Sequence, residues 1–272
     1  MFERREDTEM KMQIQAKELC DDLTLRANVH IWHVNLKADQ KAGCAAESLR
    51  VLSAQERIRA DGFRREEPRI NYVRTRGALR LLLGMYLQQH PAHVNIETTG
   101  LGKPFLASPA DAWLRFNVAH SGAQALVAIG RERRIGVDIE QVRQDLDYFA
   151  LMQKYFAAEE QAELAQLPSP DRLRAFFDCW TRKEAYLKAT GTGLLTPLDS
   201  FVVTTRPGAP NALICVEGDS LAAAGWTLRD VPVARGCSAA VAAEGKIFEV
   251  RCLDYAAAWL MESAGGTPVG MN

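Results

Sequence analysis

An aromatic ring, a carboxylate and an ammonium recur at intervals of four residues in the stretch WTRKEAYLKATGTGL. Residues four apart on a helix lie on one face, so Trp180, Glu184 and Lys188 form a single stripe. A glutamate one turn before a lysine also stabilises an ordinary exposed helix, by about 0.2 to 0.5 kcal/mol. Taken alone, the stretch is therefore more typical of a structural helix than of a functional site.

The segment IGVDIE predicts two carboxylates on one face of a strand. Alternate side chains of a strand point the same way about 6.5 Å apart, so Asp138 and Glu140 project together, opposite Ile135, Val137 and Ile139. Carboxylate oxygens are the ligands that Mg²⁺ prefers, and the ion commonly completes its shell with water and phosphate oxygens. The alternative interpretation is an edge strand whose outer face is merely polar.

Basic side chains precede these carboxylates in the chain. His120 ends a predicted strand in FNVAHSG, and Lys103 is flanked by Gly102, which lets the backbone approach a ligand, and by Pro104, which fixes a turn. Guanidinium groups bind phosphate in a bidentate manner, and the preceding helices carry many of them, although most could simply be solvated. These arginines are Arg57, Arg59, Arg64, Arg65, Arg69, Arg74, Arg76 and Arg80. A P-loop is excluded because the sequence lacks G-x-x-x-x-G-K-[ST].

The elements that would position these side chains alternate between helices and short strands. Helical spacing is predicted for LSAQERIRADGF, for the long segment that ends before Pro91, and for residues 147–164 and 170–190. Strands are predicted for VHIWHVNL, for the start of VNIETTGLGKPFL, and for WLRFNVAHSG, QALVAIG, RIGVDIEQV, SFVVTT, ALICVE, GWTLRDV, CSAAVAA and FEVRCL. This pattern favours an α+β fold over a doubly wound parallel sheet.

The chain divides into two predicted halves of about domain size. The N-terminal half covers residues 29–134, and the C-terminal half, residues 135–255, carries the carboxylates. Residues 1–28 are predicted to be an N-terminal extension, and residues 256–272 a C-terminal tail.

Composition limits the partners and the compartment. The net charge is -1, which gives no overall attraction to nucleic acid or to an anionic membrane. The six cysteines form no C-x-x-C pair, no apolar run approaches the length of a membrane span, and the charged N-terminus lacks the apolar core of a secretory signal. We therefore expect a cytoplasmic protein that binds neither nucleic acid nor membrane.

Taken in order, LSAQERIRADGF, GLGKP, FNVAHSG, IGVDIE, YFAAEE, FFDCWTRKEAYLKATGTGL and PLDSF resemble the Sfp-type 4′-phosphopantetheinyl transferases. The resemblance implies a monomer of two similar α+β halves related by a pseudo-twofold axis, with coenzyme A in the cleft between them. It also implies Mg²⁺-dependent transfer of the phosphopantetheine arm of coenzyme A to a serine of an apo acyl or peptidyl carrier protein. The products would be the holo carrier and 3′,5′-ADP.

The resemblance also assigns roles to residues. Asp138, Glu140 and Glu184 match the magnesium ligands, and Glu160 matches an acidic residue near them. The catalytic residues implied are Glu184, Lys188, Asp138 and His120. Those implied to bind coenzyme A are Arg69, Arg76, Gly102, Lys103, Pro104, Ala119, His120 and Lys188.

We hypothesise that Glu184, directly or through a bound water, accepts the serine proton, and that Lys188 stabilises the transition state or the departing 3′,5′-ADP. Two positions depart from the family pattern: Ala119 replaces a common serine, and Asn71 stands where an arginine is frequent, with Arg69 beside it.

Two other functions are compatible with parts of the pattern. A magnesium-dependent hydrolase of a nucleotide pyrophosphate would need the carboxylates but no carrier protein. A non-catalytic module that binds coenzyme A or a carrier would be expected to have lost a carboxylate or the lysine. All four of Asp138, Glu140, Glu184 and Lys188 are present, which favours an enzyme.

Overall fold

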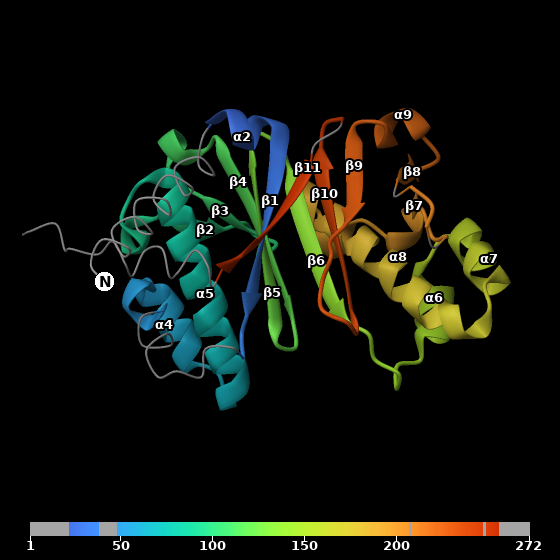
Figure 1. Ribbon diagram of the computed structural model, residues 1–272, viewed down its shortest axis with the longest axis horizontal. Coiled ribbons are helices and arrows are strands. Elements are labelled where there is room, and N and C mark those ends of the chain that lie inside the picture. The colour runs from blue at the N-terminus through green and yellow to red at the C-terminus, as the bar shows by residue number, and fades with distance from the viewer. Residues whose placement is uncertain (1–21, 38–47, 207, 211, 247–248, 256–272) are drawn as a thin grey trace, which may run out of the picture.

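Two twisted sheets lie side by side at the centre of the computed structural model, each covered on its outer face by a long helix (Figure 1). The structure describes residues 22–37, 48–206, 208–210, 212–246 and 249–255. None of the helices in these ranges is long and apolar enough to cross a membrane. The predicted α+β class is confirmed, whereas the pseudo-twofold relation between the halves stays a prediction.

The strands form two larger sheets and two short ribbons. The first sheet has the order β11-β1-β5-β4, the second has the order β6-β10-β9, and the pairs β2-β3 and β7-β8 form the ribbons. The strands are β1 (Asn28–Asn35), β2 (Ile96–Thr98), β3 (Pro104–Leu106), β4 (Leu114–Ser121), β5 (Gln124–Arg131), β6 (Ile135–Gln141), β7 (Phe201–Val203), β8 (Leu213–Val216), β9 (Trp226–Asp230), β10 (Cys237–Glu244) and β11 (Glu249–Asp254). All the predicted strands are thus present.

The helices follow the predicted periodicity with one break. They are α2 (Asp22–Ala27), α4 (Ala54–Asp61), α5 (Glu66–Leu87), α6 (Tyr148–Tyr155), α7 (Ala158–Gln166), α8 (Ser169–Thr190) and α9 (Ser220–Ala223), with 3-10 turns at Pro91–His93, Pro109–Asp111, Gly193–Leu195 and Leu198–Ser200. The continuous helical spacing predicted for residues 147–164 is interrupted at Phe156 and Ala157, whose backbones are extended. The Glu160 carboxylate accepts the N–H of Ala157 at 2.9 Å, which begins α7 there.

Three apolar layers hold the sheets and helices together. Leu79, Leu82 and Leu83 of α5 pack against the outer face of the first sheet. The inner faces of the two sheets pack against each other through branched and small side chains. On the second sheet, α8 covers Ala240 and Ala242, whose small side chains allow close approach.

The ends of the folded region depart from the predicted halves. Strand β11, inside the range predicted for the C-terminal half, pairs in parallel with β1 of the first sheet. Residues 22–27, predicted to belong to the extension, form α2, and Leu25 is fully buried in the first core. Residues 1–21 of the extension and the tail from residue 256 lie outside the described residues. The fold therefore begins before residue 29, and its last described strand belongs to the first sheet although it lies in the predicted C-terminal half.

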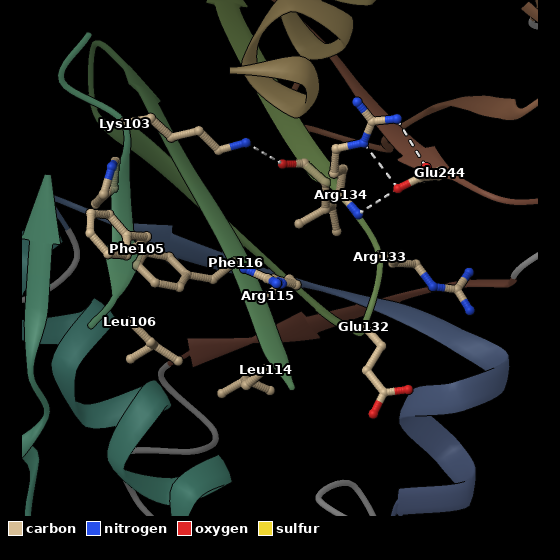
Figure 2. A pocket seen from close by; sticks show the side chains of 12 residues that line it. Lys103, Phe105, Leu106, Leu114, Arg115, Phe116, Glu132, Arg133, Arg134 and Glu244 are labelled. Carbon is tan, nitrogen blue, oxygen red and sulfur yellow. Dashed lines mark hydrogen bonds and ion pairs between the residues drawn. The ribbon is translucent and has the colours of Figure 1, made fainter. Parts of the chain in front are cut away.

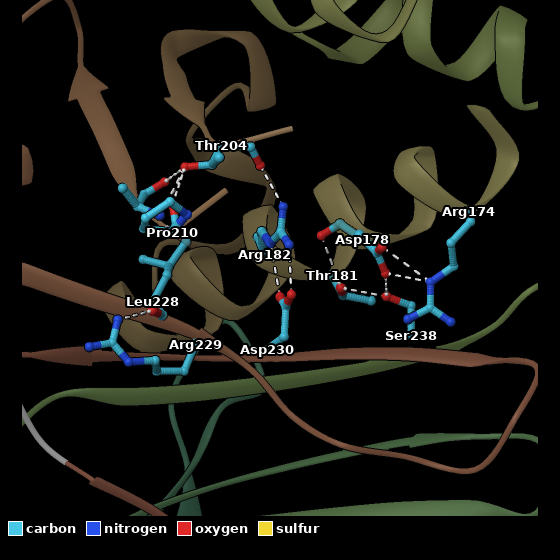
Figure 3. Close-up of polar contacts among 11 residues, drawn as sticks. Arg174, Asp178, Thr181, Arg182, Thr204, Pro210, Leu228, Arg229, Asp230 and Ser238 are labelled. Atoms are coloured by element: carbon cyan, nitrogen blue, oxygen red, sulfur yellow. Dashed lines mark hydrogen bonds and ion pairs between the residues drawn. The ribbon is translucent and has the colours of Figure 1, made fainter. Parts of the chain in front are cut away.

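Buried ion pairs fix α8 in place. Lys183 is fully buried, and its ammonium lies 2.8 Å from the Glu160 carboxylate while donating to the carbonyls of Leu198 and Phe201. One residue earlier, Arg182 forms a two-pronged pair with Asp230 at 2.9 and 2.7 Å (Figure 3). Because these charges have full sets of partners, they constrain how α8 sits against β7 and β9.

Replacing Lys183 by Met should strongly destabilise the protein. The Glu160 charge would remain buried without its partner, which costs about 3 to 5 kcal/mol of unfolding free energy. The double variant Lys183→Met, Glu160→Gln removes both charges and should recover most of the loss. Urea unfolding gives the free energy of unfolding of both variants. The control is Lys154→Met at an exposed position, whose free energy of unfolding should stay within about 0.5 kcal/mol of wild type. A single variant as stable as its control would contradict this account.

His30 should make the fold sensitive to mild acid. Burial, and secondarily the charge of Arg251, lowers the pKa of this fully buried histidine from 6.5 to about 4. Its Nδ1 lies 2.6 Å from the Tyr86 hydroxyl. Between these two pKa values the unfolded chain binds the proton and the folded chain does not, so stability falls as pH decreases through this window.

The expected contribution of His30 is a loss of about 2 kcal/mol between pH 7 and pH 5. His30→Phe should reduce the pH dependence of unfolding by that amount, whereas His93→Gln, at an exposed position, should leave it unchanged. Denaturant unfolding at both pH values provides the test. Equal pH dependence in wild type and His30→Phe would show that His30 does not titrate as inferred.

Candidate active site

Helix α8 crosses strand β6 so closely that only glycine fits at the crossing. A Cβ on Gly136 would lie 2.1 Å from the carbonyl oxygen of Ala185 and 2.3 Å from the backbone nitrogen of Ala189. Both are backbone atoms, so no side-chain rotation could make room. The glycine of IGVDIE thus brings the carboxylates of β6 under the stripe of α8 that carries Glu184 and Lys188.

Asp138 lies at the centre of this contact. Its side chain is 5% exposed, and its Oδ1 accepts a hydrogen bond from the Lys188 ammonium at 2.6 Å. Its second oxygen, Oδ2, is buried without a hydrogen-bond partner. Burial raises the pKa of Asp138 to about 7 against the opposing effect of Lys188, and the charges of Glu140 and Glu184 raise it further. The aspartate is therefore an acceptor with capacity for another cationic or hydrogen-bonding partner.

The charges of two further carboxylates, Glu140 and Glu184, act on Asp138. Burial raises the pKa of Glu184, Lys188 opposes this, and Glu140 adds to it. Glu140 accepts a hydrogen bond from the Ser121 hydroxyl at 3.2 Å. Asp138, Glu140 and Glu184 thus lie close enough for their charges to act on one another, and their role as metal ligands stays a prediction.

Strand β4 holds β6 through side chains at the junction of the two sheets. Asn117 Oδ1 accepts the N–H of Val137 at 2.9 Å, and Ser121 Oγ accepts the N–H of Gln141 at 3.0 Å. These two residues, one near each end of the carboxylate pair, set the position of β6 relative to the first sheet. Sequence reasoning missed the role of Asn117, although its position in FNVAHSG next to the predicted site was a usable signal.

The carboxylates suit a hard divalent cation by their chemistry. Within the described residues, no three His, Cys, Asp or Glu side chains already converge at metal-binding distances. The donor set nevertheless consists of oxygens alone, and Asp138 Oδ2 is a buried acceptor without a partner. Mg²⁺ is commonly held by one or two carboxylates together with substrate phosphates and water, so these residues fit that ion.

A cavity of about 690 Å³ opens beside the carboxylates. His120, Gly102, Pro104 and Arg76, four of the residues predicted to bind coenzyme A, line it, and that role stays a prediction. Partial burial and then the charge of Lys188 lower the pKa of His120, while Glu140 opposes them, which indicates that the cavity reaches the carboxylate cluster. This volume lies in the range of about 300 to 1,000 Å³ that is usual for organic ligands.

The arginine on the cavity wall is held by a buried glutamate. Glu56 Oε1 lies 3.0 Å from Arg76 Nε, and the other oxygen of Glu56 binds the buried Arg80. Above them, the Arg59 guanidinium stands over the Tyr72 ring at 5.4 Å from its centre. Glu56 thus orients Arg76 toward the cavity, a positioning role that its place in the helix pattern did not reveal.

A second groove of about 260 Å³ leads from this cavity to the stripe on α8. Glu184 and Lys188 line it together with Gly102, Lys103 and Pro104. The Lys103 ammonium is turned inward, where it donates to the last carbonyls of α8, Lys188 O and Ala189 O, and to that of Ile135 (Figure 2). Lys103 therefore joins the GKP loop to the end of α8.

Three predicted residues lie elsewhere. Arg69 pairs with Glu66 at the surface and does not line the cavity. The methyl group of Ala119 packs between the sheets, which leaves at most its backbone for a ligand. Glu160, predicted to match an acidic residue near the metal ligands, has its carboxylate bound by Lys183 and by the N–H groups of Ala157 and Val203.

Comparison with known proteins agrees with this site. The family described as the 4′-phosphopantetheinyl transferase superfamily matches residues 134–235, which include the three carboxylates and Lys188. The 4′-phosphopantetheinyl transferase HetI of Nostoc is 35% identical over 226 residues, covering 82% of this chain and 91% of that protein. The chain belongs to the 4′-phosphopantetheinyl transferase family.

Other 4′-phosphopantetheinyl transferases match shorter stretches. A putative 4′-phosphopantetheinyl transferase of Synechocystis is 34% identical over 56% of this chain and 62% of its own length. The 4′-phosphopantetheinyl transferase Sfp of Bacillus subtilis is 30% identical over 46% of this chain and 54% of its own length. The predicted family assignment is confirmed.

Gly136→Ala should separate the two sides of the site. The added methyl would force α8 away from β6, and overpacking of this kind costs about 1 to 3 kcal/mol or more. Gly100→Ala is the matched control, because a Cβ there meets nothing within 4 Å. Urea unfolding is the measurement. If Gly136→Ala were as stable as Gly100→Ala and wild type, α8 and β6 would not be in the close backbone contact described here.

Proposed function

We propose that this protein transfers the 4′-phosphopantetheine arm of coenzyme A to a serine of an apo acyl or peptidyl carrier protein. The observation that carries the proposal is the cluster of Asp138, Glu140, Glu184 and Lys188 at the groove that opens from a cation-lined cavity. Membership of the transferase family supports the same reaction.

Coenzyme A would place its nucleotide end in the larger cavity. Arg76 and His120 supply cationic and hydrogen-bonding groups for phosphates, and Arg59 lies at the same wall. The diphosphate would then lie beside Lys188, whose side chain is 31% exposed and whose ammonium pairs with Asp138. The second groove would leave room for the pantetheine arm and the incoming serine.

The protein side chains have distinct roles in this reaction. The serine oxygen forms a bond to the phosphorus that carries pantetheine, and the bond from that phosphorus to 3′,5′-ADP breaks. Glu184, whose pKa burial raises, accepts the serine proton. Lys188 stabilises negative charge on the phosphate oxygens and on the leaving 3′,5′-ADP. Asp138 orients Lys188 and, with Glu140 and Glu184, would hold the cation.

Mg²⁺, when bound by these carboxylates, would supply positive charge next to the phosphate oxygens. We further propose that the protein acts as a monomer whose two halves enclose coenzyme A, and that it works in the cytoplasm. The cytoplasmic location is compatible with the net charge of -1 and with the finding that no described helix could span a membrane.

Intact-mass measurement tests the reaction directly. The protein, coenzyme A, Mg²⁺ and a panel of apo-carrier proteins are incubated, and addition of one phosphopantetheine arm to a carrier is the expected result. Release of 3′,5′-ADP in the absence of any carrier, with no carrier modified, would instead indicate a pyrophosphate hydrolase.

Substitutions then test the named residues. Glu184→Gln and Lys188→Met should each reduce the transfer rate by at least about 10²-fold, because each removes a group placed at the reacting phosphate. Asp138→Asn should raise the Mg²⁺ concentration required for half-maximal rate. Glu159→Gln, at an exposed position on α7, is the control and should behave as wild type. Near wild-type transfer by Glu184→Gln would refute its assignment as base.

A further inference from the structure

The Lys103 side chain reaches from the β2-β3 ribbon to the end of α8 (Figure 2). Lys103 closes the turn between the two strands, and the backbone of this turn is fixed by its own hydrogen bonds. The Thr99 N–H donates to the Lys103 carbonyl at 2.9 Å, the Gly102 N–H donates to the Thr99 carbonyl at 2.9 Å, and Gly102 has a φ of 84°. The lysine therefore extends from a backbone whose position is set.

The Lys103 ammonium has a complete set of acceptors. It donates to the carbonyl of Lys188, to that of Ala189 at 3.0 Å and to that of Ile135 at 3.4 Å. An ammonium carries three hydrogens and no acceptor, so three carbonyls account for its full donor capacity. A phosphate could bind this group only by displacing a carbonyl that is already in place.

Two of these carbonyls belong to the last turn of α8, where a helix cannot supply partners of its own. Gly191 ends the helix in the left-handed conformation, with a φ of 78°. A Cβ on Gly191 would lie 3.5 Å from Lys103 Cδ, so the lysine stem lies beside this end of the helix. A cation at this end also interacts favourably with the helix dipole. Lys103 is thus a side-chain cap of α8 that a distant segment supplies.

This cap acts on the backbone of Lys188, the residue to which we assign stabilisation of the phosphate oxygens. Lys188 is held at two points: its carbonyl by Lys103, and its ammonium by Asp138 Oδ1 at 2.6 Å. Both lysines line the second groove. Burial, and then the charges of Arg115 and Arg134, lowers the pKa of Lys103 to about 8, so the charged form still predominates at pH 7. The cap therefore keeps its charge near neutral pH.

We propose that Lys103 is a positioning residue of the transferase, which fixes Lys188 at the end of α8 and does not itself bind a phosphate of coenzyme A. The inference rests on the function proposed above, and it replaces the role in coenzyme A binding that the family resemblance implies for Lys103. The phosphates would then bind Arg76, His120 and Lys188, which line the large cavity and the second groove. Because displacement of a reacting group by about 1 Å can slow a reaction about 10²-fold, loss of the cap should reduce turnover more than affinity.

Steady-state kinetics separate positioning from binding. In Lys103→Met, kcat for modification of a carrier should fall at least about tenfold, whereas KM for coenzyme A should stay within about threefold of wild type. The matched control is Lys37→Met, which removes the same charge at an exposed position after β1 and should behave as wild type. An unchanged kcat in Lys103→Met, with or without a raised KM, would overturn the proposal.

Calorimetric titration with coenzyme A in the absence of a carrier tests whether Lys103 binds a phosphate. The affinity of Lys103→Met for coenzyme A should stay within about threefold of that of Lys37→Met. Loss of a charge-assisted hydrogen bond to a phosphate would weaken binding by at least about tenfold. A loss of that size in Lys103→Met would make Lys103 a ligand of coenzyme A and would overturn the proposal.

Hydrogen exchange measured by mass spectrometry tests the cap itself. The backbone amides in the last turn of α8 should exchange at least about fivefold faster in Lys103→Met than in Lys37→Met, because the turn opens more often without its cap. Equal exchange of this turn in the two variants would overturn the proposal. The measurement needs neither coenzyme A nor a carrier, so it decides this inference even if wild type modifies no carrier, a result that would count against the proposed function alone.

Thermal unfolding checks that Lys103→Met is folded. If it is not, Lys103→Gln replaces it in all three measurements, with the same expected directions. The glutamine keeps two N–H donors on a shorter, uncharged side chain.

Discussion

The packing of α8 against β6 at Gly136 determines both the architecture and the chemistry of this protein. Backbone atoms of the helix occupy the space where a side chain would stand, so the helix and the strand lie in direct contact. This closeness buries Asp138 and places it within hydrogen-bonding distance of Lys188. It also forces the charges of the cluster into a poorly solvated region, where their mutual effects are larger than at the surface.

The charged groups of α8 and of the strand beneath it fall into two classes. On one side of the helix, Lys183 and Arg182 have complete sets of partners, and they lock the helix onto the second sheet. On the other side, Asp138 keeps one buried oxygen without a partner, and Lys188 remains partly exposed. Complete pairing is typical of residues that hold a fold, whereas incomplete pairing in a groove is typical of residues that bind a ligand.

Much of this organisation could be predicted from sequence because it depends on local periodicity. Alternation in IGVDIE gave the common face of Asp138 and Glu140, and the spacing of four gave the stripe of Glu184 and Lys188. The α+β class followed from the order of helices and strands. These features need only the geometry of one helix or strand, and the structure has them where the patterns indicated.

The remaining features depend on contacts between distant segments. The partner of Glu160 is Lys183, and a motif match cannot reveal that this carboxylate is used inside the core. Asn117 accepts the N–H of Val137 from the other sheet, and the pattern of its own strand does not identify that partner. The Lys103 ammonium turns inward because it donates to carbonyls at the end of α8. One of these is the carbonyl of Lys188, which lies 85 residues later in the chain.

The parallel pairing of β11 with β1 has a consequence for synthesis on the ribosome. One edge of β1 stays without its neighbour until more than two hundred further residues have been translated, since β11 begins at Glu249. Among the described residues, the first sheet is therefore the last part to be completed, although its first strand emerges early. During that interval the open edge of β1 offers unpaired backbone groups at which other extended chains can pair.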